Sequence, residues 1–400
     1  MSEIASDEAA VERLVKDFLT EHPPETTDDR ELRAARFDAG LAYVHFDKGF
    51  GGLGLDSSLH PMVEQLFLDA GCEDWLPRNV IGLGMAAQTV HTHGTDEQRA
   101  QYLKPLFTGE EIWCQLFSEP GAGSDLAALG ARAIPDGDGY VVNGQKIWTS
   151  FAHVARRGLL VARTDPDLPK HRGLSYFVLD MTTPGVEVRP LRQLTGQAEF
   201  NEVYLTDALV PESDRLGAVG EGWRVAMTTL MNERVAIGRR GSRRGAGAIG
   251  AAVAEFREAA AAGRADASAR DRLVRLWTRA EAARLTNVRA AAQRGAKVPG
   301  PEGSIAKLQM AELNKAIFEL CVDLRGNEGM QIEGYEMSRP DRSSGAGGST
   351  DIRRAWLRSL ANSIEGGTSE VMRNILGERV LGLPGEPRVD RDIAWKDVPR

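Results

Sequence analysis

Residues 115–125 combine the residue types that can bind a polar ligand through the backbone. They read QLFSEPGAGSD, a strand-like start leading into a turn dense in glycine, proline and serine. Glycine lacks a Cβ atom, so a ligand can approach the backbone closely there, and the free N–H groups of such a turn suit phosphate oxygens. Glycine-rich loops are common, so a ligand-binding loop and an ordinary surface turn both remain open for this segment taken alone.

A second segment, residues 146–150, ends a strand-like run with Trp148 followed by two hydroxyls, Thr149 and Ser150. An indole offers a flat apolar face to a planar heterocycle, and a hydroxyl beside it can form a hydrogen bond with a ring nitrogen. The pattern therefore suits a bound aromatic cofactor. The alternative is a core tryptophan next to two strand hydroxyls.

A third segment, residues 365–374, reads EGGTSEVMRN and places two glycines ahead of a predicted helix that continues to Val380 and Leu381. The N–H groups at a helix start have no partner within the helix and suit an anionic or partly negative oxygen. The motif is only moderately specific on its own.

The elements that must position these segments fall into three regions. Up to about Trp113 the apolar residues recur at helical spacing, and from there to about Ala218 short β-rich runs alternate with turns. Helical spacing returns from Gly222, with apolar stripes of which Leu273 and Leu276 are examples. We expect an α+β fold with an N-terminal helical domain (residues 1–112), a middle β-barrel-like domain (113–218) and a C-terminal four-helix bundle domain (219–400).

Within the middle region the dipeptide Asn143-Gly144 separates two β-rich runs, 140–142 and 146–151. Asn-Gly between such runs predicts a two-residue hairpin, because both central residues must accept positive φ. The further β-rich runs are expected to form strands at 158–164, 173–180, 186–189 and 199–206.

Composition excludes several classes of protein. The 400 residues carry a formal charge of −8, which gives no basic surface for nucleic acid. No apolar run approaches the roughly 20 residues of a membrane span, and the start is acidic rather than basic, so we expect a cytoplasmic protein without membrane insertion. The cysteines Cys72, Cys114 and Cys321 lie far apart among apolar neighbours, as reduced thiols do. His91 and His93 lack metal-ligand spacing, and no metal is expected.

A local basic cluster is formed by Arg239, Arg240, Arg243 and Arg244. It is interpreted either as a solvated helical face or as a contact with an anionic ligand.

In this order and spacing, the three segments resemble the acyl-CoA dehydrogenase family, over nearly the whole chain. The resemblance includes FGGLG at 50–54, GTDEQ at 94–98 and RVLGLP at 379–384. The succession of helical, β and helical regions agrees with the three-domain fold that the resemblance implies.

The resemblance implies a bound FAD and the α,β-desaturation of an acyl-CoA thioester, by proton abstraction at Cα and hydride transfer from Cβ to flavin N5. Trp148 would cover a face of the isoalloxazine, with Ser150 close to N5, while Gly326 would meet the adenine half across a subunit interface. The positions implied to approach FAD are Gln115, Leu116, Phe117, Ser118, Gly123, Ser124, Trp148, Thr149, Ser150, Gly326, Thr368 and Glu370. The substrate positions are Ser124, Arg234 and Gly366.

The catalytic base departs from the family's commonest pattern, in which it directly precedes the Gly-Thr of the third segment. That position is Gly366 here, and Glu365 lies one residue earlier, a shift that turns a helical side chain by about 100°. Another branch, with isovaleryl- and long-chain acyl-CoA dehydrogenases, places the base on the first long C-terminal helix directly before an arginine, which matches Glu233 and Arg234. We predict Glu233 as the base, with Glu365 and a site lacking a competent base as alternatives.

The roles around Glu233 also have alternatives. Glu233 could be an ordinary exposed helical glutamate, the usual place of that residue. Arg234 would orient the substrate or hold the helix of Glu233, and an arginine bound only to a structural carboxylate is the alternative. Gly366 can still give its backbone N–H to the thioester oxygen, where negative charge develops during proton removal.

A second departure concerns the contact between subunits. Many relatives carry Arg-x-x-Phe-Gly in the bundle to meet the neighbouring subunit's FAD, and the corresponding stretch, residues 259–273, lacks it. Arg264, Arg270 and Arg272 are the possible substitutes. The resemblance implies an electron-transfer flavoprotein as acceptor and a homotetramer, with a homodimer or a heterotetramer with a paralogue as alternatives. The alternatives for function are one subunit of a heteromeric dehydrogenase, a flavin-dependent oxidase or elimination enzyme acting on an acyl-CoA, and a flavin-free scaffold.

Overall fold

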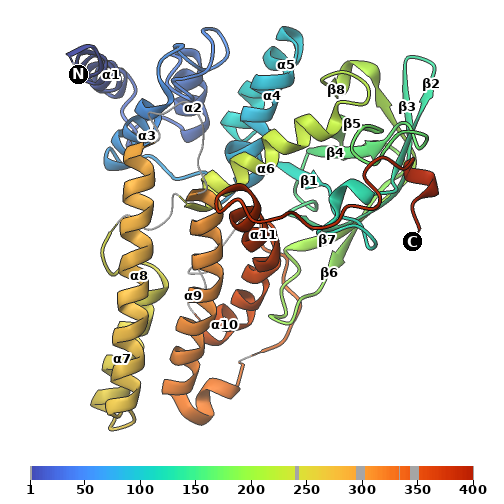
Figure 1. The fold of residues 1–400 in the computed structure, drawn as a ribbon. Coiled ribbons are helices and arrows are strands. Elements are labelled where there is room, and N and C mark those ends of the chain that lie inside the picture. Colours follow the sequence, from blue (N-terminus) through green and yellow to red (C-terminus); the bar gives the residue numbers. More distant parts are fainter. Residues whose placement is uncertain (1, 239–242, 294–301, 333, 343–350, 400) are drawn as a thin grey trace.

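The computed structural model describes residues 2–238, 243–293, 302–332, 334–342 and 351–399, and within these the side chains of 2–7, 233–238, 291–293 and 302 are outside the description. In chain order the elements are helices, then one sheet, then long helices (Figure 1). The expected α+β class is confirmed by this arrangement.

The N-terminal region is built from short helices with clear start signals. Thr95 caps the last of them: its hydroxyl accepts the Gln98 N–H, and the Gln98 side chain accepts the Thr95 N–H. Gly109 ends the same helix with φ +76°. The helices are α1 (Ser2–Glu21), α2 (Asp29–Asp38), α3 (His60–Asp69), the π-helical turn η2 (Gly82–Ala86), α4 (Ala87–His93) and α5 (Asp96–Thr108).

The middle region is one eight-stranded sheet in the order β6-β7-β3-β2-β4-β5-β8, with β1 paired in parallel to β4. Its longest pairing is antiparallel and joins β3 to β7. The strands are β1 (Trp113–Leu116), β2 (Arg132–Asp136), β3 (Gly139–Ser150), β4 (Arg157–Arg163), β5 (Leu174–Asp180), β6 (Val186–Leu191), β7 (Phe200–Pro211) and β8 (Arg215–Leu216). The strands expected at 158–164, 173–180, 186–189 and 199–206 are confirmed.

The hairpin predicted at Asn143-Gly144 is wrong. Both residues lie inside β3, where the pairing with β7 shifts register between Val142 and Gly144. The turn before β3 is instead at residues 137–138, between β2 and β3. A Cβ atom at Gly144 would lie 2.6 Å from the Cβ of Ala131, so this glycine permits close backbone packing at a bulge and does not turn the chain.

The C-terminal region is a bundle whose long helices α8 and α9 lie side by side with α7 and α10 (Figure 1). Its core contains the predicted stripe residues Leu273 and Leu276 of α8, together with Ile317, Leu320 and Leu324 of α9. The helices are α6 (Gly222–Gly238), α7 (Ala248–Ala261), α8 (Ala267–Gln293), α9 (Glu302–Arg325), α10 (Ile352–Ser359) and α11 (Ser369–Arg379).

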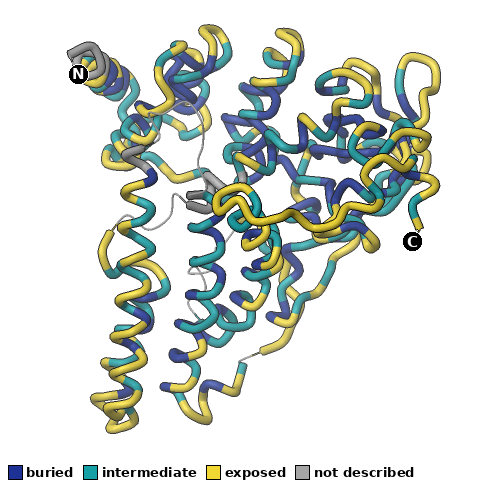
Figure 2. The backbone as a smooth tube through the Cα atoms, viewed as in Figure 1, coloured by how far each residue is buried: buried dark blue, intermediate teal, exposed yellow. Residues whose placement is uncertain are grey.

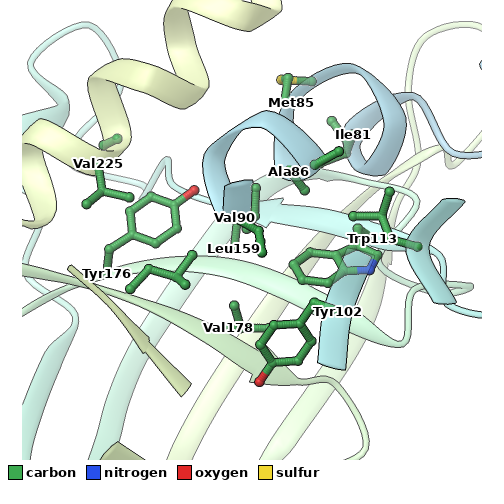
Figure 3. Close-up of a cluster of buried hydrophobic side chains, with 14 of the residues drawn as sticks. Ile81, Met85, Ala86, Val90, Tyr102, Trp113, Leu159, Tyr176, Val178 and Val225 are labelled. Atoms are coloured by element: carbon green, nitrogen blue, oxygen red, sulfur yellow. The ribbon is translucent and has the colours of Figure 1, made fainter. Parts of the chain in front are cut away.

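A single apolar core connects the first helices, the sheet and α6 (Figure 3). Met85 of η2, Leu159 of β4, Tyr176 of β5 and Val225 of α6 all belong to it and are buried. Because these four elements share one core, α6 is held in a fixed place against the sheet.

The chain after α11 leaves the bundle and returns to the sheet. Figure 1 shows this dark red segment crossing from α11 toward the β region, and Figure 2 shows most of it exposed. Residues 381–389 are all exposed, whereas Trp395 is buried. The segment therefore makes its main contacts at its far end.

Two expectations from composition concern this architecture. Among the helices in the described ranges, none combines the length and the hydrophobicity that crossing a bilayer requires. The three cysteines are free, and burial raises the pKa of Cys114 and Cys321.

Candidate functional site

The first and second segments lie side by side. The Ile147 N–H donates to the Ser118 carbonyl at 2.9 Å. Lys146, fully buried, donates through Nζ to the Phe117 carbonyl at 3.1 Å and to the Glu119 carboxylate at 2.8 Å. Burial lowers the pKa of Lys146, and Glu119 opposes that shift. This buried ion pair connects the end of β1 to β3. From the sequence, Glu119 and Lys146 could be named only as members of the first and second segments, not as partners.

The glycine-rich loop, defined as residues 119–131, is anchored at its base and open at its tip. The Glu119 carboxylate accepts the N–H groups of Gly130 at 2.6 Å and Ala131 at 2.9 Å. Gly123 and Ser124 are exposed, and a Cβ atom at Gly123 would meet nothing within 4 Å. A fixed base and an accessible glycine-rich tip suit phosphate groups.

The residues before this loop differ in what they can offer. Leu116 and Phe117 are buried, and the Phe117 ring packs edge-on against Tyr176 with centroids 5.8 Å apart. Gln115 and Ser118 are partly exposed. A ligand in the site would therefore meet Leu116 and Phe117 mainly through their backbone.

Trp148 has the geometry of a ligand platform. Its side chain is 56% exposed, so the alternative of a core tryptophan is wrong. The backbone φ is +60°, an uncommon conformation for a bulky residue and one that concentrates at functional sites. The ring meets Phe200 of β7 edge-on at 5.9 Å, which leaves indole surface open to a planar partner.

Thr149 adds a polar group beside this platform. Its side chain is fully buried, and its Oγ1 has no hydrogen-bond partner among the residues that the structure describes. A buried hydroxyl without a partner is costly. An exposed aromatic face beside such a hydroxyl fits a flat heterocycle with hydrogen-bonding atoms at its edge, as the isoalloxazine of FAD has.

Arg358 of α10 joins the third segment to the start of β7, the strand whose Phe200 packs against Trp148. Its guanidinium donates to both oxygens of Glu365 at 2.9 Å and to Glu199 at 2.7 Å, and Glu199 directly precedes Phe200. Burial by itself lowers the pKa of Arg358, but the two carboxylates outweigh it and raise the pKa above its usual value. The carboxylate of Glu365 also accepts from Asn362 Nδ2 at 2.7 Å.

The helix predicted after the glycine pair is present, and it ends at Arg379, just before Val380 and Leu381. Gly366 and Gly367 both have positive φ, +63° and +91°. Thr368 caps α11 by accepting the Val371 N–H at 3.1 Å, and Glu370 is exposed in the first turn.

Lys307 of α9 forms hydrogen bonds with the same glycine turn. Its Nζ donates to the Asn362 carbonyl at 2.9 Å and to the carbonyl of Gly367. The side chain is 1% exposed. The glycine turn ahead of α11 is therefore fixed by a buried cation, a role that no local sequence pattern indicated.

Glu233 and Arg234 lie on α6, and their side chains are outside the described residues. One turn earlier on the same helix face, the Thr229 hydroxyl lies 2.8 Å from the Tyr176 hydroxyl and 2.9 Å from that of Thr89. These buried hydroxyls link α6 to β5 and α4. Position 233 therefore follows a turn that faces the sheet.

The remaining predicted positions are not brought to these segments within this chain. Gly326 follows α9, is exposed, and has φ +58° with open space at its Cβ position. Arg264 donates to the Leu324 carbonyl and Arg272 to Asp323 at 2.7 Å, both on α9, while Arg270 is exposed.

The basic cluster is only partly described, because Arg239 and Arg240 lie outside the described residues. Arg243 borders a shallow hollow of about 290 Å³ together with Trp277 and Glu281. None of the residues that line this hollow belongs to the three segments.

No group of three or more histidine, cysteine or carboxylate side chains in the described ranges could hold a metal ion. His91 accepts the Asp47 N–H at 3.1 Å and stacks on Phe46 with centroids 3.9 Å apart. His93 lies 2.8 Å from the hydroxyl of Thr228.

Comparison with known proteins gives matches along most of the chain. Three family models match in order: the acyl-CoA dehydrogenase N-terminal domain at residues 6–110, the middle domain at 114–208 and the C-terminal domain at 220–381. These ranges together contain all three segments.

Two mycobacterial proteins are among the similar curated relatives. Acyl-CoA dehydrogenase FadE34 of Mycobacterium tuberculosis is 38% identical over 89% of this chain, but the chain spans only about half, 46%, of that protein's length. Acyl-CoA dehydrogenase IpdE1 of the same organism is 36% identical over 88% of this chain and 86% of its own.

Two solved structures share the fold at similar levels. The ChsE4-ChsE5 complex from Mycobacterium tuberculosis is 26% identical with a TM-score of 0.67, covering 95% of this chain and 98% of the matched one. An acyl-CoA dehydrogenase from Geobacillus kaustophilus is 25% identical with a TM-score of 0.68 and the same coverage.

Proposed function

The chain belongs to the acyl-CoA dehydrogenase family, and we propose that it catalyses the FAD-dependent α,β-desaturation of an acyl-CoA thioester. The main support for the proposal is that side-chain and backbone contacts connect the three segments. The Ser118 carbonyl is hydrogen-bonded to the Ile147 N–H. Arg358 binds both Glu365 and Glu199, and Glu199 directly precedes Phe200, whose ring packs against Trp148. The glycine-rich loop, the strand with the exposed indole and the glycine turn at a helix start are thereby linked through direct contacts.

FAD, when bound, supplies the acceptor for the hydride that leaves the β carbon. On the protein side, the open indole of Trp148 covers a face of the ring system, and the hydroxyls of Thr149 and Ser150 bond its polar edge. Ser124 at the tip of the glycine-rich loop binds phosphate, and Thr368 and Glu370 approach from the start of α11. The unpaired buried Oγ1 of Thr149 supports this assignment.

Glu233 removes the α proton in this proposal. The α carbon is weakly acidic, so the thioester oxygen must be stabilised while charge develops, and the Gly366 N–H donates to it. Arg234, next to the base, orients the substrate. The proposal is supported by the fixed place of α6, whose Thr229 lies one turn before the base and is bonded to the sheet.

Glu365, the alternative base, has a different role in this account. Its two oxygens are taken up by the guanidinium of Arg358. With both oxygens bound to the guanidinium, and one also to Asn362, the carboxylate is held in a fixed position between its partners. Glu365 therefore positions the glycine turn.

For assembly we propose a homotetramer in which exposed Gly326 meets the adenine half of a neighbouring FAD. Pairing with a paralogue is the second possibility, favoured by the missing Arg-x-x-Phe-Gly motif and by the similarity to one chain of the ChsE4-ChsE5 complex. FAD occupancy that is low in the isolated chain and restored by co-expression with a paralogue would favour the pair.

Electron-transfer flavoprotein is the proposed acceptor of the electrons. A cytoplasmic location belongs to the same proposal, and its support is the presence of three unpaired thiols.

Turnover of a panel of acyl-CoA thioesters with an artificial electron acceptor tests the activity. The expected product is the enoyl-CoA, two mass units lighter than the substrate by mass spectrometry. Consumption of oxygen without an added acceptor would identify an oxidase, and loss of a substituent from the acyl chain would identify an elimination. Either outcome would replace the proposed reaction.

A further inference from the structure

The end of the chain is fastened to the loops beside the site. We call residues 390–398 the strap. The Trp395 N–H donates to the Leu168 carbonyl at 2.9 Å and the Lys396 N–H to the Pro166 carbonyl at 3.1 Å. The strap thus lies along the connection between β4 and β5, after the exposed crossing of residues 381–389.

Trp395 also reaches the glycine-rich loop. Its indole Nε1 donates to the Ala128 carbonyl at 3.0 Å, and the side chain is 5% exposed although the segment before it is open to solvent. A Cβ atom at Gly130 would lie 3.6 Å from the indole, so the ring covers the returning limb of the loop.

Arg163 of β4 completes the packing around this ring. Its guanidinium lies 4.5 Å from the centroid of Trp395 and donates to the carbonyls of Ala127 at 2.6 Å and Leu129 at 3.2 Å. The returning limb of the glycine-rich loop is thereby bonded to Arg163 and to the strap. One of these two partners is contributed by the last residues of the described chain.

A second tie runs through Lys170. Its Nζ donates to Asp125 at 2.7 Å and to Asp390 of the strap at 2.6 Å. Asp125 directly follows Ser124 at the loop tip, where its negative charge would repel a phosphate. Lys170 neutralises that charge and fixes the carboxylate of Asp125 by a hydrogen bond. Lys170 is itself bound by Asp390 of the strap.

We propose that the strap positions the glycine-rich loop for phosphate binding, with Trp395 as the principal positioning residue. The inference rests on the proposed function, in which the loop binds phosphate groups of FAD or of the acyl-CoA. The base of the loop is fixed by Glu119 and Lys146 without the strap. Removal of the strap therefore loosens the limb and the tip, while the core of the sheet keeps its contacts.

The test uses Trp395→Ala in the full chain, with Val389→Ala as control, because Val389 ends the exposed crossing directly before the strap and is 86% exposed. Expected for Trp395→Ala is a rise of about tenfold in the Kd for FAD or in the KM for acyl-CoA, which corresponds to the loss of one or two good contacts. At saturating FAD and substrate, kcat stays near the wild-type value. Trp395→Phe keeps an aromatic ring over Gly130 and loses one hydrogen bond. Its Kd for FAD or KM for acyl-CoA is therefore expected to lie between the values of wild type and Trp395→Ala.

Measuring both the Kd for FAD and the KM for acyl-CoA identifies which phosphates the loop binds. A change in the FAD constant alone assigns the loop to the pyrophosphate of FAD, and a change in KM alone assigns it to the CoA moiety. Asp390→Ala, which breaks only the Lys170 tie, serves if Trp395→Ala does not fold, and the same rise without loss of kcat is expected.

Two results would overturn the proposal. One is unchanged binding constants while trypsin cleaves the strap faster than in wild type, which would show that a released strap has no effect on the loop. The other is a fall in kcat and melting temperature without any change in Kd or KM, which would show a structural role alone. A wild-type protein that binds no FAD and turns over no acyl-CoA, alone or co-expressed with a paralogue, would refute the proposed function itself.

Discussion

The two candidate bases, Glu365 and Glu233, lie on different elements and are assigned different tasks. Glu365 is held by Arg358 and Asn362. Glu233 lies on α6, one turn after Thr229, whose hydroxyl bonds Tyr176 of the sheet. The account assigns proton removal to Glu233 and positioning of the glycine turn to Glu365.

Replacing each glutamate by glutamine separates these tasks. Glu233→Gln is expected to lower kcat by at least about 10²-fold, since general-base catalysis typically contributes 10²- to 10⁴-fold, with FAD content unchanged. Glu365→Gln is expected to keep activity within about tenfold of wild type and to lower the melting temperature, because Arg358 loses a charged partner. Steady-state kinetics and thermal melting of both variants at equal FAD content check the prediction. The reverse order of activities would assign the base to Glu365.

Thr149 allows a test of cofactor contact that needs no turnover. Thr149→Val removes the buried, unpaired hydroxyl while keeping the shape, so the FAD-free protein is expected to be as stable as wild type or more stable. If the hydroxyl bonds FAD, the Kd for FAD rises about fivefold, the size of one ordinary hydrogen bond. Flavin fluorescence quenching measures it, and exposed Thr206 of β7, changed to valine, is the control. An unchanged Kd would remove Thr149 from the FAD contacts.

At the scale of elements, Arg358 is the link between the bundle and the sheet. Its side chain is 23% exposed, and its partners Glu199 and Glu365 are 8% and 35% exposed. The pair with Glu199 is nearly buried, so loss of the arginine leaves a carboxylate without a counter-charge in a poorly solvated place.

Arg358→Met is therefore expected to lower the free energy of unfolding by about 2 kcal/mol, below the 3–5 kcal/mol of a fully buried pair because the arginine is partly solvated. Arg373→Met is the matched control, since its pair with Glu370 at 3.6 Å is exposed on both sides and an exposed pair contributes well under 1 kcal/mol. Urea unfolding of the two variants measures the difference. Equal losses would mean that Arg358 is an ordinary surface arginine.

Much of the element order could be predicted because its signals are local. The strands from β4 to β7 follow β-rich runs bounded by turn residues, and α11 begins where Gly366-Gly367 and capping Thr368 indicated. Asn143-Gly144 misled, because the same dipeptide that favours a hairpin also fits a bulge when a long partner strand such as β7 is available.

The contacts that tie the site together were beyond the sequence for a physical reason. Arg358 and Glu199 are 159 residues apart, and Trp395 and Ala128 are 267 apart. No periodicity or spacing encodes a pairing at such separations. Individual site residues could be named from their motifs and the family resemblance, but the side chains that hold those motifs together could only be found in three dimensions.

At the scale of the whole molecule, FAD should act as part of the fold. The three segments come from β1, β3 and the start of α11, so a ligand between them contacts elements from the sheet and the bundle at once. A ligand at 100 times its Kd stabilises the native state by about 2.7 kcal/mol. Removal of FAD is expected to lower the melting temperature by several degrees, and FAD added back should restore it, whereas riboflavin, which lacks the phosphates, should restore less. Equal melting with and without FAD would place the cofactor outside this junction.

Anaerobic titration of the purified protein with acyl-CoA thioesters is the decisive test of α,β-dehydrogenation, because it follows one round of hydride transfer without an external acceptor. We predict bleaching of the oxidised flavin absorbance by one class of acyl-CoA, with a long-wavelength charge-transfer band as enoyl-CoA forms beside the reduced cofactor. Glu233→Gln should bind the same thioester and stay oxidised. Bound flavin that none of a broad panel of acyl-CoAs reduces would contradict α,β-dehydrogenation of an acyl-CoA by this protein.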